Sequence, residues 1–153
     1  MSSILKVKQK LYDACFQFIE NRLITVQKTI NEIQESLTSE TKSSAGDKHE
    51  TGRAMLQLER EKAGNQLAEI MKVKEAFSKI DVSKTNKTVG LGSVVYTSQN
   101  NYFIAISAGQ ITIDKDHFYA ISPNTPIGKL LVGKNASDVF SFRDIKIQIK
   151  EVL

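Results

Sequence analysis

The first half of the chain carries apolar residues at a spacing that alternates between four and three positions, and this feature constrains the fold most. The series is Tyr12, Phe16, Ile19, Leu23, Val26, Ile30, Ile33 and Leu37. Such a heptad repeat places every apolar side chain on one narrow stripe of an α-helix. Gln, Glu, Asn, Lys and Thr occupy most of the positions between them. A helix with so narrow a stripe needs a partner to cover it, which predicts a coiled coil.

The next segment of the chain supplies a partner helix. Residues 38–48 contain no large apolar side chain and are rich in Ser, Thr and Gly, which predicts a turn. A second helical pattern follows from about His49 to Ile80. Its seam contains Leu56, Ala63, Leu67, Ile70 and Phe77. Arg60 and Lys74 occupy the alternate seam positions, and we expect their long side chains to snorkel past a thin interface. The two helices are predicted to form an antiparallel hairpin with the turn at its tip.

After Asp81 the chain becomes a polar linker and then a series of short β-type runs separated by turn residues. The predicted strands are residues 93–97, 102–107, 110–113, 117–121, 138–142 and 145–152. Asn124 is predicted to cap a short helix from about Pro126 to Val132, which Gly133 ends. We therefore predict an α+β protein.

The predicted domain boundary lies near residue 84. Residues 1–84 are expected to form the helical hairpin. Residues 85–153 are expected to form an antiparallel β domain with one short helix.

Composition and charge exclude several classes of protein. The chain has 153 residues, of which 41% are hydrophobic and 25% charged, as in ordinary soluble folded proteins. The net charge of +4 is spread evenly along the chain, which argues against a dedicated nucleic-acid surface. A single cysteine, Cys15, interpreted as a small apolar helix residue, and two distant histidines disfavour a disulfide or a structural zinc site. Without a membrane-spanning run or a signal-peptide pattern, we expect the protein in the cytoplasm.

The turn contains two acids three residues apart, Asp47 and Glu50. On a helix this spacing puts both carboxylates on one face, where together they offer oxygen ligands suited to Mg²⁺. The same Asp-x-x-Glu pattern at the start of a helix is also a capping box, in which the two side chains bond to backbone N–H groups. The two interpretations are compatible, because capping holds the carboxylates in place until a partner engages them.

Two segments resemble the Gre family of bacterial transcript-cleavage factors. Residues 46–50 read Gly-Asp-Lys-His-Glu, and the family tip reads Gly-Asp-Leu-x-Glu-Asn. Residues 125–134, Thr-Pro-Ile-Gly-Lys-Leu-Leu-Val-Gly-Lys, are similar to the Ser/Thr-Pro, short helix and Gly-Lys of the family's C-terminal domain. The resemblance extends over most of the chain. It implies a C-terminal domain like that of FK506-binding proteins (FKBP-like), docked on the rim of the polymerase's secondary channel.

The resemblance also implies a function. The hairpin would enter the secondary channel of bacterial RNA polymerase, where Asp47 and Glu50 would promote hydrolysis of backtracked nascent RNA. They would do so by sharing Mg²⁺ with the polymerase, and the isolated protein would hold no cofactor. The protein would thus stimulate the polymerase's own hydrolytic activity without being an enzyme, and it would have no small-molecule substrate and no membrane partner.

Four neighbouring residues are further candidates for tip contacts. Lys48 stands where the family has an apolar residue and Thr51 where it has asparagine, which supports an alternative regulator that occupies the channel without promoting cleavage. His49 is interpreted as a bystander or a proton-transfer group. Arg53 is interpreted as a contact to phosphate or carboxylate, or as a solvated helix residue.

Two alternatives belong to other functional classes. The expected FKBP-like fold suggests a prolyl isomerase as one alternative. Against it, the chain has no tryptophan for the floor of a substrate pocket, and most of its aromatic residues are expected in the core. A holdase or assembly adaptor would need exposed apolar residues at the tip, and residues 38–48 offer none.

Overall fold

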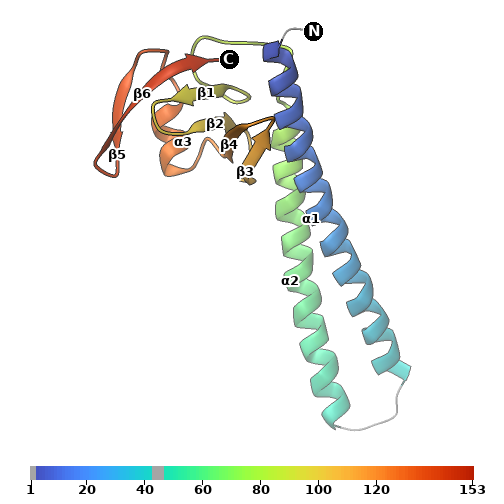
Figure 1. Cartoon of the computed structure of the whole chain (residues 1–153). Helices are drawn as coiled ribbons and strands as arrows, with labels where there is room; N and C mark the ends of the chain where they lie inside the picture. The colour runs from blue at the N-terminus through green and yellow to red at the C-terminus, as the bar shows by residue number, and fades with distance from the viewer. Residues whose placement is uncertain (1–2, 43–46) are drawn as a thin grey trace. The chain divides into compact units, whose positions relative to one another are not determined.

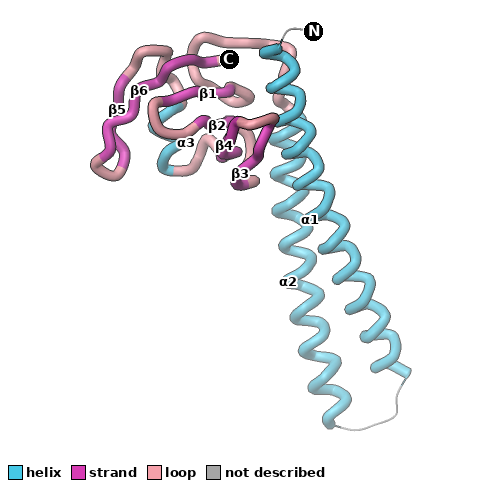
Figure 2. The backbone as a smooth tube through the Cα atoms, viewed as in Figure 1, coloured by secondary structure: helices cyan, strands magenta, loops and turns pink. Residues whose placement is uncertain are grey.

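The described residues form two long helices, a six-stranded sheet and a short third helix. The computed structural model describes the backbone of residues 3–42 and 47–153 and the side chains of residues 3–39 and 50–153. In chain order the elements are α1 (Ser3–Lys42), α2 (Asp47–Ser78), β1 (Val94–Thr97), β2 (Asn101–Ile104), β3 (Gly109–Ile113), β4 (Asp116–Ile121), α3 (Pro126–Leu131), β5 (Val139–Phe142) and β6 (Ile145–Val152) (Figures 1 and 2). All of the predicted elements are present, and the α+β class is confirmed.

The chain divides into two compact units. One is Ile19–Glu75, and the other combines Met1–Phe18 with Ala76–Leu153. The ends of both long helices therefore belong to the unit that contains the sheet. Whether residues 85–153 fold without those helix ends, as the predicted domains 1–84 and 85–153 require, stays a prediction. Among the described helices, none has an apolar stretch long enough to cross a membrane.

The unit Ile19–Glu75 is a helical hairpin whose seam follows the predicted heptads. Its buried residues are Ile19, Leu23, Ile33 and Leu37 on α1, and Ala63 and Ile70 on α2. Ile33, Leu37 and Ala63 form a cluster, against which Ile30 and Leu56 pack. Lys74 reaches past the seam to an ion pair with Glu20, whose Oε1 lies 2.9 Å from the lysine Nζ. The expectation that long side chains leave the interface is met at Lys74.

α1 extends further than the sequence predicted, because it continues through residues 38–42. The prediction of a turn there rested on Ser and Thr competing for backbone hydrogen bonds. Thr38 instead donates its hydroxyl hydrogen to the carbonyl of Gln34 one turn earlier, at 3.0 Å. Thr25 and Thr29 make the same kind of bond. A hydroxyl satisfied within the helix removes the reason for the helix to end.

The sheet has the strand order β3-β4-β2-β1-β6-β5. Neighbouring strands run antiparallel except β2 and β4, which are parallel. This pair departs from the antiparallel sheet expected from the sequence. The chain reverses once between β2 and β3 and again in the β3–β4 hairpin, so β4 enters beside β2 in the same direction. One parallel pair thus follows from two local reversals.

The sheet is buried on one face, and its second face is covered at β2 but exposed along β6. One face packs with α3 in a core of Val89, Val95, Tyr102, Ile104, Leu131, Phe140, Ile147 and Ile149. In β2, Phe103 lies between two of these residues and has no exposed surface. Because successive side chains in a strand point to opposite faces, Phe103 shows that the second face is covered at β2.

The start of α1, which belongs to this unit, buries a different stripe from the one predicted. Leu11 and Cys15 have no exposed surface, whereas Phe16 is 42% exposed. Tyr12 is half-buried and stacks on Phe77 with ring centroids 4.4 Å apart. The predicted seam is therefore wrong at Phe16. Before Ile19 the helix belongs to the sheet-containing unit, so its buried stripe is shifted by one residue.

Thr125 caps α3, and the prediction of Asn124 as the cap is wrong. The Thr125 hydroxyl accepts from the backbone N–H of Gly128 at 3.1 Å and donates to the carbonyl of Ser122 at 2.8 Å. The predicted end at Gly133 is confirmed, because this glycine adopts a φ of +89° directly after the C-cap Val132.

Candidate functional site

The candidate site lies at the start of α2, which begins at Asp47. The backbone of residues 47–50 is helical, so Asp47 and Glu50 occupy the first turn of α2, three positions apart. Side chains of Asp47, Lys48 and His49 lie outside the described residues, so the choice between a capping box and outward carboxylates stays open for them.

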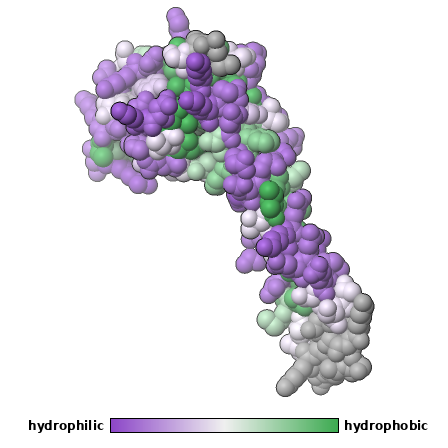
Figure 3. Space-filling view, turned by 45° about the vertical axis from the view of Figure 1, so that its right-hand side comes forward, coloured by the Kyte–Doolittle hydropathy of each residue, from purple (hydrophilic) through white to green (hydrophobic). Residues whose placement is uncertain are grey.

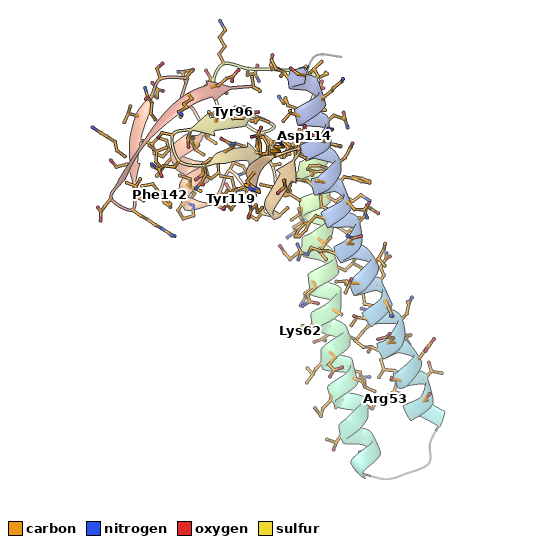
Figure 4. All side chains as sticks on the ribbon, in the orientation of Figure 1. Arg53, Lys62, Tyr96, Asp114, Tyr119 and Phe142 are labelled. Carbon is orange, nitrogen blue, oxygen red and sulfur yellow. The ribbon has the colours of Figure 1, made fainter. Side chains whose placement is uncertain are left out.

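The described tip residues are Glu50, Thr51 and Arg53. Glu50 and Thr51 are exposed, whereas Arg53 is half-buried. Arg53 points from α2 toward α1 (Figure 4), and its Nη1 donates to the carbonyl oxygen of Leu37 at 3.3 Å. Leu37 belongs to the apolar cluster of the hairpin. Arg53 therefore links the two helices directly behind the tip.

This role of Arg53 differs from both interpretations drawn from the sequence. The residue was considered as a contact to phosphate or carboxylate, or as a solvated helix residue, and neither anticipates a bond to the opposite helix. The position of Arg53 in the predicted hairpin could have indicated this bond. Antiparallel pairing about the turn brings the end of α1 opposite the start of α2.

That the isolated tip holds no divalent ion stays a prediction, because the side chains of Asp47 and His49 lie outside the described residues. Among the residues whose side chains are described, no three His, Cys, Asp or Glu side chains form a metal-binding group. Asp47 and Glu50 together offer two carboxylates to an ion that prefers six oxygen ligands. The chemistry available to the tip is thus to supplement an ion whose other ligands come from elsewhere.

Apolar side chains are exposed on the hairpin beyond the turn. Figure 3 shows apolar patches interrupting its mostly hydrophilic surface. On α2, Met55 is 60% exposed and Leu58 is 66% exposed. They lie about two and about three turns after Asp47, outside residues 38–48, which contain no large apolar residue. Exposed apolar residues of the kind that a holdase or adaptor needs are therefore present on the hairpin.

A second candidate site is a groove of about 290 Å³ in the sheet-containing unit. Its apolar lining includes Tyr102, Tyr119, Ile127 and Phe142. Figure 4 labels two of them, Tyr119 and Phe142. The guanidinium of Arg143, also in the lining, lies 5.0 Å from the centre of the Phe142 ring. Most aromatic residues were expected in the core, yet Tyr119 is 37% exposed and faces this groove. The groove has the size and lining to accept a small apolar group, such as a proline ring.

No protein-family model matches the sequence. No curated protein matches it either. A solved structure described as that of the transcription factor Gfh1 is similar, with 17% sequence identity and a TM-score of 0.35 over 90% of this chain and 92% of that chain. At this level the likeness carries no argument, so the function must be inferred from the residues themselves.

Proposed function

We propose that this protein is an accessory factor of bacterial RNA polymerase that promotes cleavage of backtracked RNA. One observation carries the proposal: a two-helix hairpin holds the pair Asp47 and Glu50 in the first turn of α2, with Glu50 exposed. The tip and C-terminal motifs that resemble the Gre family support it. The protein acts in the cytoplasm, where the polymerase is.

The length of the hairpin suits an active centre that lies deep in a channel. α2 has 32 residues, which at about 1.5 Å each make a rod of about 48 Å. A flexible loop would lose too much conformational entropy on being held at such a depth. The paired helices and the bond from Arg53 to Leu37 reduce that cost, because the tip is supported before binding.

The tip acids act by supplementing the polymerase. Mg²⁺ ions in two-metal centres activate water and stabilise the leaving oxygen of a phosphodiester. The carboxylates of Asp47 and Glu50 provide oxygen ligands that the polymerase centre lacks for its loosely held second ion. This protein contributes two ligands and their negative charge, and the polymerase contributes the remaining ligands and the RNA. Neither hydrolysis nor tight Mg²⁺ binding is expected of the isolated protein.

The test uses backtracked elongation complexes with the full chain. The wild-type protein should accelerate release of short 3′ RNA fragments. The double substitution Asp47→Asn and Glu50→Gln should abolish the acceleration and leave polymerase binding nearly intact, because the amides keep shape and lose charge. A matched control removes two exposed acids farther along α2, Glu59→Gln and Glu61→Gln, and should retain activity.

Two outcomes separate the proposal from its alternatives. Polymerase binding without fragments identifies a channel-occupying regulator, and Lys48 is then the first residue to replace, because its positive charge opposes a second cation. Failure to bind polymerase contradicts both versions.

The groove beside Tyr119 favours a second candidate of a different class, a protein that binds or isomerises prolyl peptides. Its lining and its volume of about 290 Å³ suit a proline side chain. Turnover of a proline-containing peptide by the full chain, lost in Tyr119→Ala, would support this candidate. Absence of turnover at high protein concentration would eliminate the isomerase.

A further inference from the structure

A polar pocket of about 170 Å³ lies in the sheet-containing unit, and its lining shares no residue with the acidic tip or with the aromatic groove. Its polar lining consists of Lys8, Lys79, Asp81, Lys84, Asn86 and Ser93. Lys8 belongs to α1, and the others belong to the segment that runs from the end of α2 to the start of β1 (Figure 1). The pocket therefore gathers residues that are far apart in the sequence.

The pocket carries excess positive charge. Three lysines face one acid, Asp81, which leaves two positive charges. Among the described residues, no carboxylate lies within ion-pair distance of Lys8, Lys79 or Lys84. Asp81 is already engaged, since its Oδ1 accepts from the backbone N–H of Ser83 at 3.0 Å and from the Ser83 hydroxyl at 2.5 Å. The hydroxyl and the N–H of Ser83 lower the pKa of Asp81, so it stays ionised and engaged.

Lys8 is the most unusual member of the lining. It is only 2% exposed and lies on the same helix stripe as Leu11 and Cys15, where an apolar residue is expected. Its Nζ donates to the carbonyl oxygen of Lys84 at 2.7 Å. An ammonium has three N–H donors, and no described residue accepts from the other two. Burying a charged group with unsatisfied donors is costly, and burial lowers the pKa of Lys8 accordingly.

Two neutral groups complete a set of donors. The amide of Asn86 can donate two hydrogens. The hydroxyl of Ser93 accepts from the backbone N–H of Gly90 at 3.0 Å, which leaves its own hydrogen for a ligand. At about 30 Å³ for each water in the liquid, the pocket volume corresponds to roughly five or six waters. That is space for a single tetrahedral oxyanion and too little for a nucleoside.

We propose that this pocket binds a phosphate dianion, either free inorganic phosphate or the terminal phosphoryl group of a small molecule. The two excess positive charges match the charge of the dianion, and the donors come from α1, the end of α2, the linker and the loop before β1. The bound anion would accept from Lys8 and join these segments. This inference stands apart from the proposed action on RNA polymerase.

The first experiment measures binding of inorganic phosphate to the full chain by isothermal titration calorimetry and thermal melting. Sodium chloride at equal ionic strength serves as the salt control. Phosphate should bind at one site and raise the melting temperature by about 5–10 °C at a 100-fold excess over the Kd, because it binds only the folded state. An equal rise with chloride would overturn the proposal. A phosphomonoester that binds more tightly than phosphate assigns the site to the phosphoryl group of a small molecule, and equal or weaker binding assigns it to free phosphate.

Substitutions test the assignment of the site. Lys79→Gln and Lys84→Gln change exposed side chains of the lining and should each weaken phosphate binding about 10- to 100-fold, the range for a hydrogen bond to a charged group. Lys87→Gln removes an exposed linker lysine outside the lining and is the matched control, with unchanged affinity expected. Equal losses in Lys87→Gln and Lys79→Gln would overturn the proposal.

Lys8→Met separates ligand binding from a purely structural role of Lys8. Methionine is unbranched and fits the buried stripe without the charge. The variant should bind no phosphate, while its melting temperature without phosphate should equal or exceed that of the wild type. Phosphate binding that persists in Lys8→Met contradicts the site. Binding of an RNA oligonucleotide that free phosphate does not displace would also contradict it, in favour of a nucleic-acid surface.

Discussion

Replacing Phe77 with alanine should lower the free energy of unfolding of the sheet-containing unit by about 3–5 kcal/mol, whereas the same substitution at Phe16 should cost only about 1–2 kcal/mol. The sequence pattern places both residues in the seam between the helices. In the structure Phe77 is 2% exposed and Phe16 is 42% exposed. The two variants therefore test the shift of the buried stripe at the start of α1. Both replace the same type of side chain, phenylalanine, with alanine.

The expected difference follows from the exposed surface. A phenylalanine buries roughly 200 Å², and the two exposed fractions, 42% and 2%, differ by 40 percentage points of that area. At about 25 cal/mol per Å² this difference is worth about 2 kcal/mol. Loss of the stacking of Phe77 on Tyr12, whose ring centroids lie 4.4 Å apart, adds about 0.5–1.5 kcal/mol.

Tyrosine fluorescence during urea unfolding is the suitable assay. The chain has no tryptophan and four tyrosines, Tyr12, Tyr96, Tyr102 and Tyr119, all within the sheet-containing unit. The signal therefore reports this unit and not the hairpin Ile19–Glu75. Midpoints should fall in the order wild type, Phe16→Ala, Phe77→Ala, with similar slopes. If Phe16→Ala costs as much as Phe77→Ala, the heptad seam continues to the start of α1 and the observed shift is refuted.

Three further predictions concern the same unit. Thr125→Ala should cost about 1 kcal/mol in urea unfolding through loss of the α3 cap, and Asn124→Ala should cost almost nothing. Gly128→Ala should prevent a cooperative thermal transition, because the new Cβ would collide with the backbone oxygen of Ser122, and a normal transition would contradict this tight packing. Burial raises the pKa of Cys15 to about 12 from 9.0, so the folded state retains a proton that the unfolded chain releases. Stability should fall as pH rises from 9.0 toward 12, with a smaller fall in Cys15→Ala, measured by urea unfolding across that range.

Local patterns in the sequence determined the elements of this protein. The alternating Ile145, Ile147 and Ile149 predicted β6, and the heptad series through Ile19, Leu23 and Ile33 predicted the hairpin. Both patterns depend on the repeat of a single element, 2 residues for a strand and about 3.5 for a coiled coil, so a short stretch of chain contains the whole signal. The two acids three residues apart at the start of α2, Asp47 and Glu50, are visible for the same reason.

The cap of α3 marks the limit of local information. Asn124 and Thr125 are neighbours with nearly equal preference for the position, so the sequence does not distinguish them. The path of the chain after β4 decides the matter, because it brings the Thr125 hydroxyl between the carbonyl of Ser122 and the N–H of Gly128.

Contacts between distant segments were decided only by the tertiary structure. The parallel pairing of β2 with β4 and the burial of Cys15 in place of Phe16 both depend on which surface each element meets, and that surface comes from elsewhere in the chain. The pocket around Lys8 depends on the fold in the same way. Its ammonium bonds to the carbonyl of Lys84, 76 positions along the chain. Periodicity records which side of an element is apolar, but only the packed fold determines what that side, or a lysine within it, will contact.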